Sequence, residues 1–189
     1  MSRGTGLDHS EDAPHRLLSS RELARAGRLA LVLDEVEWPG GDRGVYRWFQ
    51  ATSAAFIVPV FEDGSTMLVR QWRYPWRETS WEVPAGTLEE DEEPLAGARR
   101  ELAEETGLRA ERWTPLGVMR PSALLDSRQF LFLAEGVSEA ERALESYERD
   151  LITRRLGLEE AVREALEGGI AHATAVSALC RAAHALKLL

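Results

Sequence analysis

The front of the chain alternates apolar and polar positions in the way that is typical of β-strands. Residues 28–38 are expected to form a strand, in which Val36 and Trp38 alternate with Glu35 and Glu37. Further strands are expected over residues 17–24 and 45–52, and the segment PGGDRG between strands has the composition of a turn. We therefore expect residues 17–52 to form an antiparallel β-meander that precedes a larger domain, residues 53–189.

The rest of the chain predicts a mixture of strands and helices. Residues 54–61 are almost uninterruptedly apolar, which is typical of a strand buried on both faces. Apolar residues at helical spacing predict a final amphipathic helix over residues 173–187, preceded by another over residues 159–166. Further strands are expected over residues 66–74, 81–84, 112–119 and 129–134. The polar stretch 138–150 has no pattern that assigns it.

The most informative segment is residues 86–108, which read GTLEEDEEPLAGARRELAEETGL. Glu101, Glu104 and Glu105 stand at i, i+3 and i+4, so on a helix they fall within an arc of roughly 100° and share one face. Like charges at this spacing repel one another, and a cation between them would reverse that effect. Carboxylate oxygens are ligands that Mg²⁺ prefers. The alternative is a solvated acidic face, which is what most charge runs are.

Local signals place these acids on a helix. Asp91 is the expected N-cap, Pro94 suits the first turn, and Gly107 is where a left-handed C-terminal residue would sit. Arg100 lies beside the acids and could orient one of them. An apolar stripe at helical spacing is formed by Leu95, Ala98 and Leu102.

Composition narrows the class of protein. The 189 residues suggest one domain, or one domain with an extension, and 44% are hydrophobic, which is enough for a core. A formal charge of −9 argues against a nucleic-acid partner but allows a phosphate substrate, because metal ions can supply positive charge. Residues 1–16 are polar and are expected to form a disordered tail rather than a signal peptide. With no apolar run near the about 20 residues that cross a bilayer, we expect a cytoplasmic protein without a membrane partner.

The acidic segment fits the pattern G-x5-E-x7-R-E-U-x-E-E-x-G-U, where U is a bulky apolar residue. It resembles the Nudix box at every defining position. The resemblance implies a metal-dependent hydrolase of nucleoside diphosphates linked to another group. It also implies an α/β fold, an α/β/α sandwich with a mixed sheet, in which the box forms a loop, a helix and a second loop.

Segments upstream of the box resemble those of one Nudix subgroup, the ADP-ribose pyrophosphatases. They are RQWRYP, residues 70–75, and WEVPAG, residues 81–86. The resemblance implies that Arg73 contacts the diphosphate and that Glu82 lies close to the site. It also implies that Mg²⁺, or alternatively Mn²⁺, is held by the backbone carbonyl of Ala85 and by Glu101, Glu104 and Glu105.

Other interpretations of these flanking residues stay open. Arg73 could form a surface ion pair, and Glu82 could merely pair with an arginine. Arg70 is a further candidate for substrate binding, but its odd separation from Arg73 puts the two on opposite faces of a strand. Several aromatic residues could stack on a base or belong instead to the core or a dimer interface; they are Trp48, Phe49, Trp72, Tyr74, Trp76 and Trp81.

Two features depart from the subgroup. Residues 120–127, RPSALLDS, keep the proline of the usual loop but lack its glycine and the glutamate that follows, which puts selectivity for the terminal ribose in question. The general base of the subgroup often comes from a glutamate on a late loop. Glu148 is favoured here over Glu145 and Asp150, and a box glutamate, Glu104 or Glu105, is the alternative.

The sequence thus predicts a Mg²⁺-dependent hydrolase of a nucleotide-sugar substrate, ADP-ribose, with AMP and ribose 5-phosphate as products. One alternative keeps the fold and changes the substrate to a GDP-sugar, NADH, or a nucleoside di- or triphosphate. Another is a non-catalytic nucleotide-sugar sensor. The resemblance also implies a homodimer in which the N-terminal strands cross to the partner.

Overall fold

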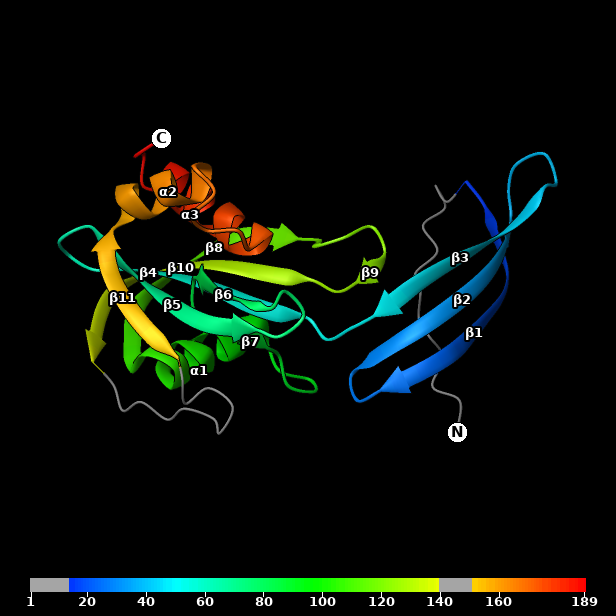
Figure 1. The fold of residues 1–189 in the computed structure, drawn as a ribbon, viewed down its shortest axis with the longest axis horizontal. Helices are drawn as coiled ribbons and strands as arrows, with labels where there is room; N and C mark the ends of the chain where they lie inside the picture. Colours follow the sequence, from blue (N-terminus) through cyan, green and yellow to red (C-terminus); the bar gives the residue numbers. More distant parts are fainter. Residues whose placement is uncertain (1–13, 140–150) are drawn as a thin grey trace. The chain divides into compact units, whose positions relative to one another are not determined.

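The structure is a computed structural model that describes residues 14–139 and 151–189 (Figure 1). The chain forms two compact units. One comprises Met1–Ala51 with Leu124–Asp126, and the other comprises Thr52–Ala123 with Ser127–Leu189. Most of the expected N-terminal tail and most of the polar stretch 138–150 lie outside the described residues.

The smaller unit is a four-stranded sheet in the order β1-β2-β3-β9. Its strands are β1 (Arg16–Ala26), β2 (Leu29–Glu37), β3 (Arg43–Gln50) and β9 (Leu125–Asp126). The first three pair antiparallel, which confirms the strands expected at the front of the chain. The turn before β2 contains Gly27 at φ 56°, a left-handed conformation that glycine adopts without steric cost. The short β9 was not expected; it pairs parallel to β3, with Leu125 opposite Phe49.

The larger unit is built on a mixed sheet with the central order β11-β5-β4-β10-β8. Its strands are β4 (Ala54–Val60), β5 (Ser65–Arg73), β6 (Glu78–Glu82), β7 (Ala85–Thr87), β8 (Leu108–Met119), β10 (Gln129–Glu139) and β11 (Ile152–Gly157). β4 and β10 are parallel, whereas β10 and β8 are antiparallel. β6 pairs with β5 and β7 pairs with β4, so the short strands before the acidic helix are part of the same sheet.

In the described part of the chain, three helices cover the two faces of this sheet (Figure 1). They are α1 (Pro94–Thr106), α2 (Leu158–Leu166) and α3 (Ala173–Ala185). On β4, Ala55 and Ile57 pack in the core under α1, while Phe56 and Val58 pack in the core under α2 and α3. Every residue of β4 is buried, as the apolar run predicted, and the expected α/β/α sandwich is confirmed.

One local expectation was wrong. Asp91 is not the N-cap of α1: Glu93 holds that position, and Asp91 has φ 61° in the preceding turn. For three of the aromatic residues the core alternative is excluded, since Trp72, Tyr74 and Trp76 are 55%, 67% and 44% exposed. The C-terminal end of α1 is as expected, because Gly107 adopts φ 68° and its N–H bonds to the carbonyl of Ala103. In residues 14–139 and 151–189, no helix has the length and apolarity needed to cross a membrane.

The packing of α1 on the sheet makes a stability prediction. Leu102 is fully buried in the core under α1, so Leu102→Ala should lower the free energy of unfolding by about 2–4 kcal/mol through lost burial and a residual cavity. Urea denaturation measures this. The matched control is Leu166→Ala on α2, where the side chain is 67% exposed and the change should stay within about 0.5 kcal/mol. Equal losses in both variants would contradict the assigned packing.

Candidate active site

Glu101 lies directly against the backbone of Gly86. Its side chain is almost fully buried, and a Cβ atom built on Gly86 would lie 2.0 Å from the carboxyl carbon of Glu101. Only glycine, which has no Cβ, leaves room for this contact. The first glycine of the motif thus has a steric role: it lets a carboxylate of α1 approach β7.

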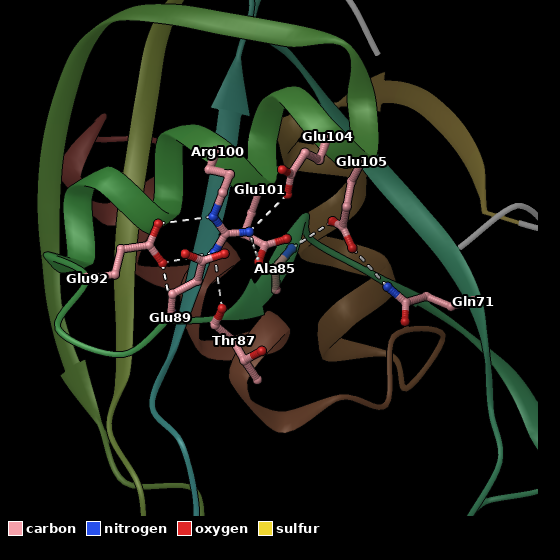
Figure 2. Close-up of polar contacts among 9 residues, drawn as sticks. All are labelled: Gln71, Ala85, Thr87, Glu89, Glu92, Arg100, Glu101, Glu104 and Glu105. Carbon is pink, nitrogen blue, oxygen red and sulfur yellow. Dashed lines mark hydrogen bonds and ion pairs between the residues drawn. The ribbon is translucent and has the colours of Figure 1, made fainter. Parts of the chain in front are cut away.

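Arg100 offsets part of the negative charge around α1 by binding three carboxylates. Its Nη1 donates to Glu101 Oε1 at 2.7 Å and to Glu104 Oε2 at 2.9 Å (Figure 2). Its Nε and Nη2 donate to the two oxygens of Glu92 at 3.0 and 2.9 Å, and Nη2 also reaches the carbonyl of Thr87 at 3.1 Å. The hydrogen bonds to Arg100 lower the pKa of Glu92, and the same contacts raise the pKa of Arg100. Arg100 was expected to orient one acid, and it holds three.

Glu105 joins three elements of the larger unit. Its side chain is fully buried. One carboxylate oxygen accepts from the backbone N–H of Ala85 at 2.8 Å, and the other accepts from Nε2 of Gln71 at 3.1 Å. These bonds connect α1 to β7 and β5, so a buried anion fixes the helix against the strands. Two hydrogen-bond donors on a buried carboxylate offset the cost of its desolvation.

The residue types at this site suit a divalent cation. Carboxylates of Glu101, Glu104 and Glu105 and the carbonyl of Ala85 are hard oxygen donors. The part of the chain that the structure describes holds no group of three or more His, Cys, Asp or Glu side chains placed to bind a metal ion. The reason is local: Arg100 occupies the space between Glu101 and Glu104, and Glu105 turns toward Ala85 and Gln71. A cation held by all three acids therefore requires Glu104, which is partly exposed, to exchange its bond with Arg100.

A cavity of about 360 Å³ lies beside Gly86. It is lined by Ala54, Phe56, Arg73, Pro75, Trp76, Ala85, Gly86, Thr87 and His172. Arg73 donates from Nε and Nη2 to the two oxygens of Glu82 at 2.7 and 2.5 Å, and Glu82 is fully buried. Burial alone would lower the pKa of Arg73, but the hydrogen bonds and charge of Glu82 outweigh it and raise that pKa. Arg73 therefore forms an ion pair, with a buried rather than a surface carboxylate, and it also lines the cavity; its contact with a diphosphate stays a prediction.

The remaining expected site residues are Arg70, Trp48 and Glu148. Arg70 does not line this cavity; its guanidinium carbon lies 5.6 Å from the ring centroid of Trp81. Trp48 belongs to the smaller unit, where its indole N–H donates to Asp34 at 2.7 Å. Glu148, with the other two candidates for the base, falls outside the described residues.

Sequence reasoning missed two residues of the site, Gln71 and His172. Gln71 is two positions before Arg73 on a strand, so its side chain shares a face with Arg73, and that spacing could have identified it. His172 caps α3 and lines the cavity. Its sequence position gave no signal of this role, because its neighbours Phe56 and Glu82 come from distant strands.

A mixed sheet between helices, with a carboxylate-rich helix beside a cavity, defines the class of Nudix-type α/β/α sandwiches. The sequence model of the NUDIX domain matches residues 51–175, and the chain belongs to the Nudix family. Hydrolases of this family generally use divalent metals. A solved structure of an ADP compounds hydrolase matches with a TM-score of 0.82 at 24% identity, covering 92% of this chain and 94% of that one, which shows the same fold.

Two relatives are similar over most of the sequence. The ADP-ribose pyrophosphatase of Bacillus subtilis (strain 168) is 32% identical over 150 residues, which cover 78% of this chain and 81% of the relative. The ADP-ribose pyrophosphatase of Mycobacterium tuberculosis (strain ATCC 25618 / H37Rv) is 31% identical over 172 residues, which cover 89% of this chain and 83% of the relative.

The contact between Gly86 and Glu101 makes a prediction about metal binding. In Gly86→Ala the new methyl group must displace the Glu101 carboxylate, so Mn²⁺ binding measured by electron paramagnetic resonance should weaken about tenfold or more. Overpacking should also cost about 1–3 kcal/mol of stability in urea. Gly157→Ala is the control, because a Cβ there meets nothing closer than 3.9 Å. Unchanged Mn²⁺ affinity in Gly86→Ala would show that Glu101 does not hold the ion.

Proposed function

We propose that this protein hydrolyses the diphosphate of ADP-ribose to AMP and ribose 5-phosphate, with Mg²⁺ as the preferred cation and Mn²⁺ as a substitute. One observation carries the proposal: the box acids Glu101, Glu104 and Glu105 lie beside a cavity that Arg73 lines. Two of these acids, Glu101 and Glu105, are buried. Relatives that cover most of the chain and are named ADP-ribose pyrophosphatases support the choice of substrate.

In this proposal Glu101, Glu104, Glu105 and the carbonyl of Ala85 hold the metal. A bound divalent cation supplies charge that neutralises the phosphate oxygens and acidifies a water molecule. The protein supplies the positions of these groups: Gly86 gives Glu101 room to approach, and the N–H of Ala85 fixes Glu105.

Arg73 binds the diphosphate in the same proposal. Its guanidinium lines the cavity and is held from behind by two hydrogen bonds to buried Glu82. A cation that is already fixed needs little reorganisation when negative charge builds on the phosphate oxygens, and this is the main source of electrostatic catalysis. Glu82 is therefore a positioning residue for Arg73.

The general base stays a prediction. Glu148 is the favoured candidate, with Glu104 or Glu105 as the alternative. Among the box acids, Glu105 already accepts hydrogen bonds from Ala85 and Gln71, and these bonds hold it in place as an anion. Glu104 is more accessible to a water molecule, because its side chain is 27% exposed.

We also propose that the protein is a homodimer that pairs through the β-meander, residues 17–52. Exposed apolar side chains on β1, β2 and β3 support this, because a large exposed apolar surface marks an interaction site. They are Leu23, Leu29, Val45, Tyr46 and Phe49. The cytoplasmic location expected from the sequence stays a prediction.

Glu104→Gln tests the proposed chemistry. Removing this negative charge should lower Mg²⁺-dependent turnover of ADP-ribose by about 100-fold or more, measured by release of AMP. Glu104 is a better target than Glu105, since an amide at the buried position 105 would place its N–H₂ group against one of the two donors, the N–H of Ala85 or Nε2 of Gln71.

The control is Glu159→Gln, an exposed glutamate in the first turn of α2, which should keep wild-type turnover. Circular dichroism checks that both variants are folded. Wild-type rates in a folded Glu104→Gln variant would remove the metal site from the proposal.

A second candidate function keeps the site and changes the substrate. It is favoured by residues 120–127, which lack the glycine and glutamate of the subgroup and contain β9. A panel of ADP-ribose, GDP-sugar, NADH and nucleoside di- and triphosphates, compared by kcat/KM, decides between the two. We expect ADP-ribose to rank first, and a higher value for any other member of the panel would replace it as the substrate.

A further inference from the structure

His172 lies where the cavity meets the start of α3. It is the N-cap residue of α3, and its Nδ1 accepts the backbone N–H of Ala175 at 3.4 Å. Its ring lies near two aromatic neighbours, with centroids 5.4 Å from Phe56 and 5.8 Å from Trp76. All three rings line the cavity. A histidine at a helix cap is a structural feature by itself, so any further role depends on its second nitrogen.

The cap contact determines where the imidazole carries its proton. A nitrogen that accepts a backbone N–H has a free lone pair, so Nδ1 is unprotonated and Nε2 bears the hydrogen. Burial lowers the pKa of His172, and the nearby charge of Arg73 lowers it as well, while Glu82 opposes the shift. At neutral pH the ring is therefore neutral, and Nε2 is a hydrogen-bond donor.

The Nε2 atom faces the carboxylate that holds Arg73. It lies 3.7 Å from Oε2 of Glu82, the same oxygen that accepts from Nη2 of Arg73. Glu82 is fully buried, and a charge interaction is stronger there than in water. Arg73 and His172 thus approach one buried carboxylate from two elements, and both also form the wall of the cavity.

We propose that His172 is a positioning residue for Arg73, acting through Glu82. The partial positive charge on Nε2–H attracts Oε2 and limits the movement of the Glu82 carboxylate. The two hydrogen bonds from Arg73 then hold the guanidinium at one place in the cavity wall. The inference rests on the proposed function, in which Arg73 binds the diphosphate.

Two substitutions separate this role from the structural one. Asparagine at position 172 keeps an acceptor near the place of Nδ1, and asparagine is a strong N-cap, but it has no donor that reaches Glu82. Glutamine extends an N–H₂ donor near the place of Nε2 and is a poor cap. Both lose the ring, so contacts with Phe56 and Trp76 are lost equally.

The expected kinetic result is opposite in the two variants. His172→Asn should raise KM for ADP-ribose about fivefold or more, with kcat within about twofold of wild type and the smaller loss of thermal stability. His172→Gln should melt at a lower temperature and keep KM within about twofold of wild type. Equal KM values in the two variants would overturn the proposal. So would a higher KM in the variant that melts at the lower temperature.

A double-mutant cycle tests whether the effect passes through Arg73. The affinity for a non-hydrolysable ADP-ribose analogue is measured by calorimetry with Mg²⁺ present, so that turnover does not consume the ligand. His172→Asn should weaken binding in the wild-type background and have no further effect in the Arg73→Ala background. An equal effect in both backgrounds would show that His172 acts independently of Arg73. This cycle decides the matter even if His172→Gln does not fold.

A readout without substrate keeps this inference separate from the proposed function. Exchange of the Arg73 Nε–H with water, measured by ¹⁵N NMR, should be slow in wild type and His172→Gln and at least several-fold faster in His172→Asn. Equal exchange rates would overturn the positioning role. Failure of wild type to hydrolyse ADP-ribose would refute the proposed substrate alone, and the cycle would then use the nucleotide that ranks first in the panel.

Discussion

The bonds of Arg100 to three carboxylates are the interaction on which the acidic helix depends. Acids three and four positions apart repel one another, and a buried unpaired carboxylate is costly. The planar guanidinium offsets both effects, because it binds Glu92 with two parallel hydrogen bonds and reaches Glu101 and Glu104 from its other edge. Its bond to the carbonyl of Thr87 also fixes the loop that leads away from β7.

Two glycines make these bonds sterically possible. Gly86 leaves room for the Glu101 carboxylate, and Gly97 leaves room for the side chain of Leu88, whose Cδ2 would be 2.4 Å from an added Cβ. The loop, the helix and β7 therefore pack as one unit around Arg100. The spacing of glycine, glutamate and arginine in the motif follows from these contacts, because each residue must reach the others across a loop of fixed length.

The sequence predicted those elements whose cause is local. The buried β4 and the helix α1 follow from apolar patterns and from Gly107, which ends the helix. β11 was missed because its sequence, ITRRLG, places two arginines in a row. Their acidic partners lie elsewhere in the sequence: Arg155 binds Asp63 and Arg154 binds Glu164. The shared face of the three box acids was predictable from their spacing. Their partners were not, because packing determines that Glu101 and Glu104 bind Arg100 whereas Glu105 binds Gln71.

Two arginine–carboxylate systems are present at this site, and in the proposed function neither leaves positive charge free for an anionic substrate. Of the described residues that line the cavity, Arg73 is the one with a full positive charge, and Glu82 already balances that charge. The single charge of Arg100 is outweighed by its three acids. A diphosphate entering the cavity would therefore meet a wall with no surplus positive charge, in a protein of formal charge −9. Divalent cations on the box acids would reverse that sign locally, because each ion adds two positive charges where phosphate oxygens would lie.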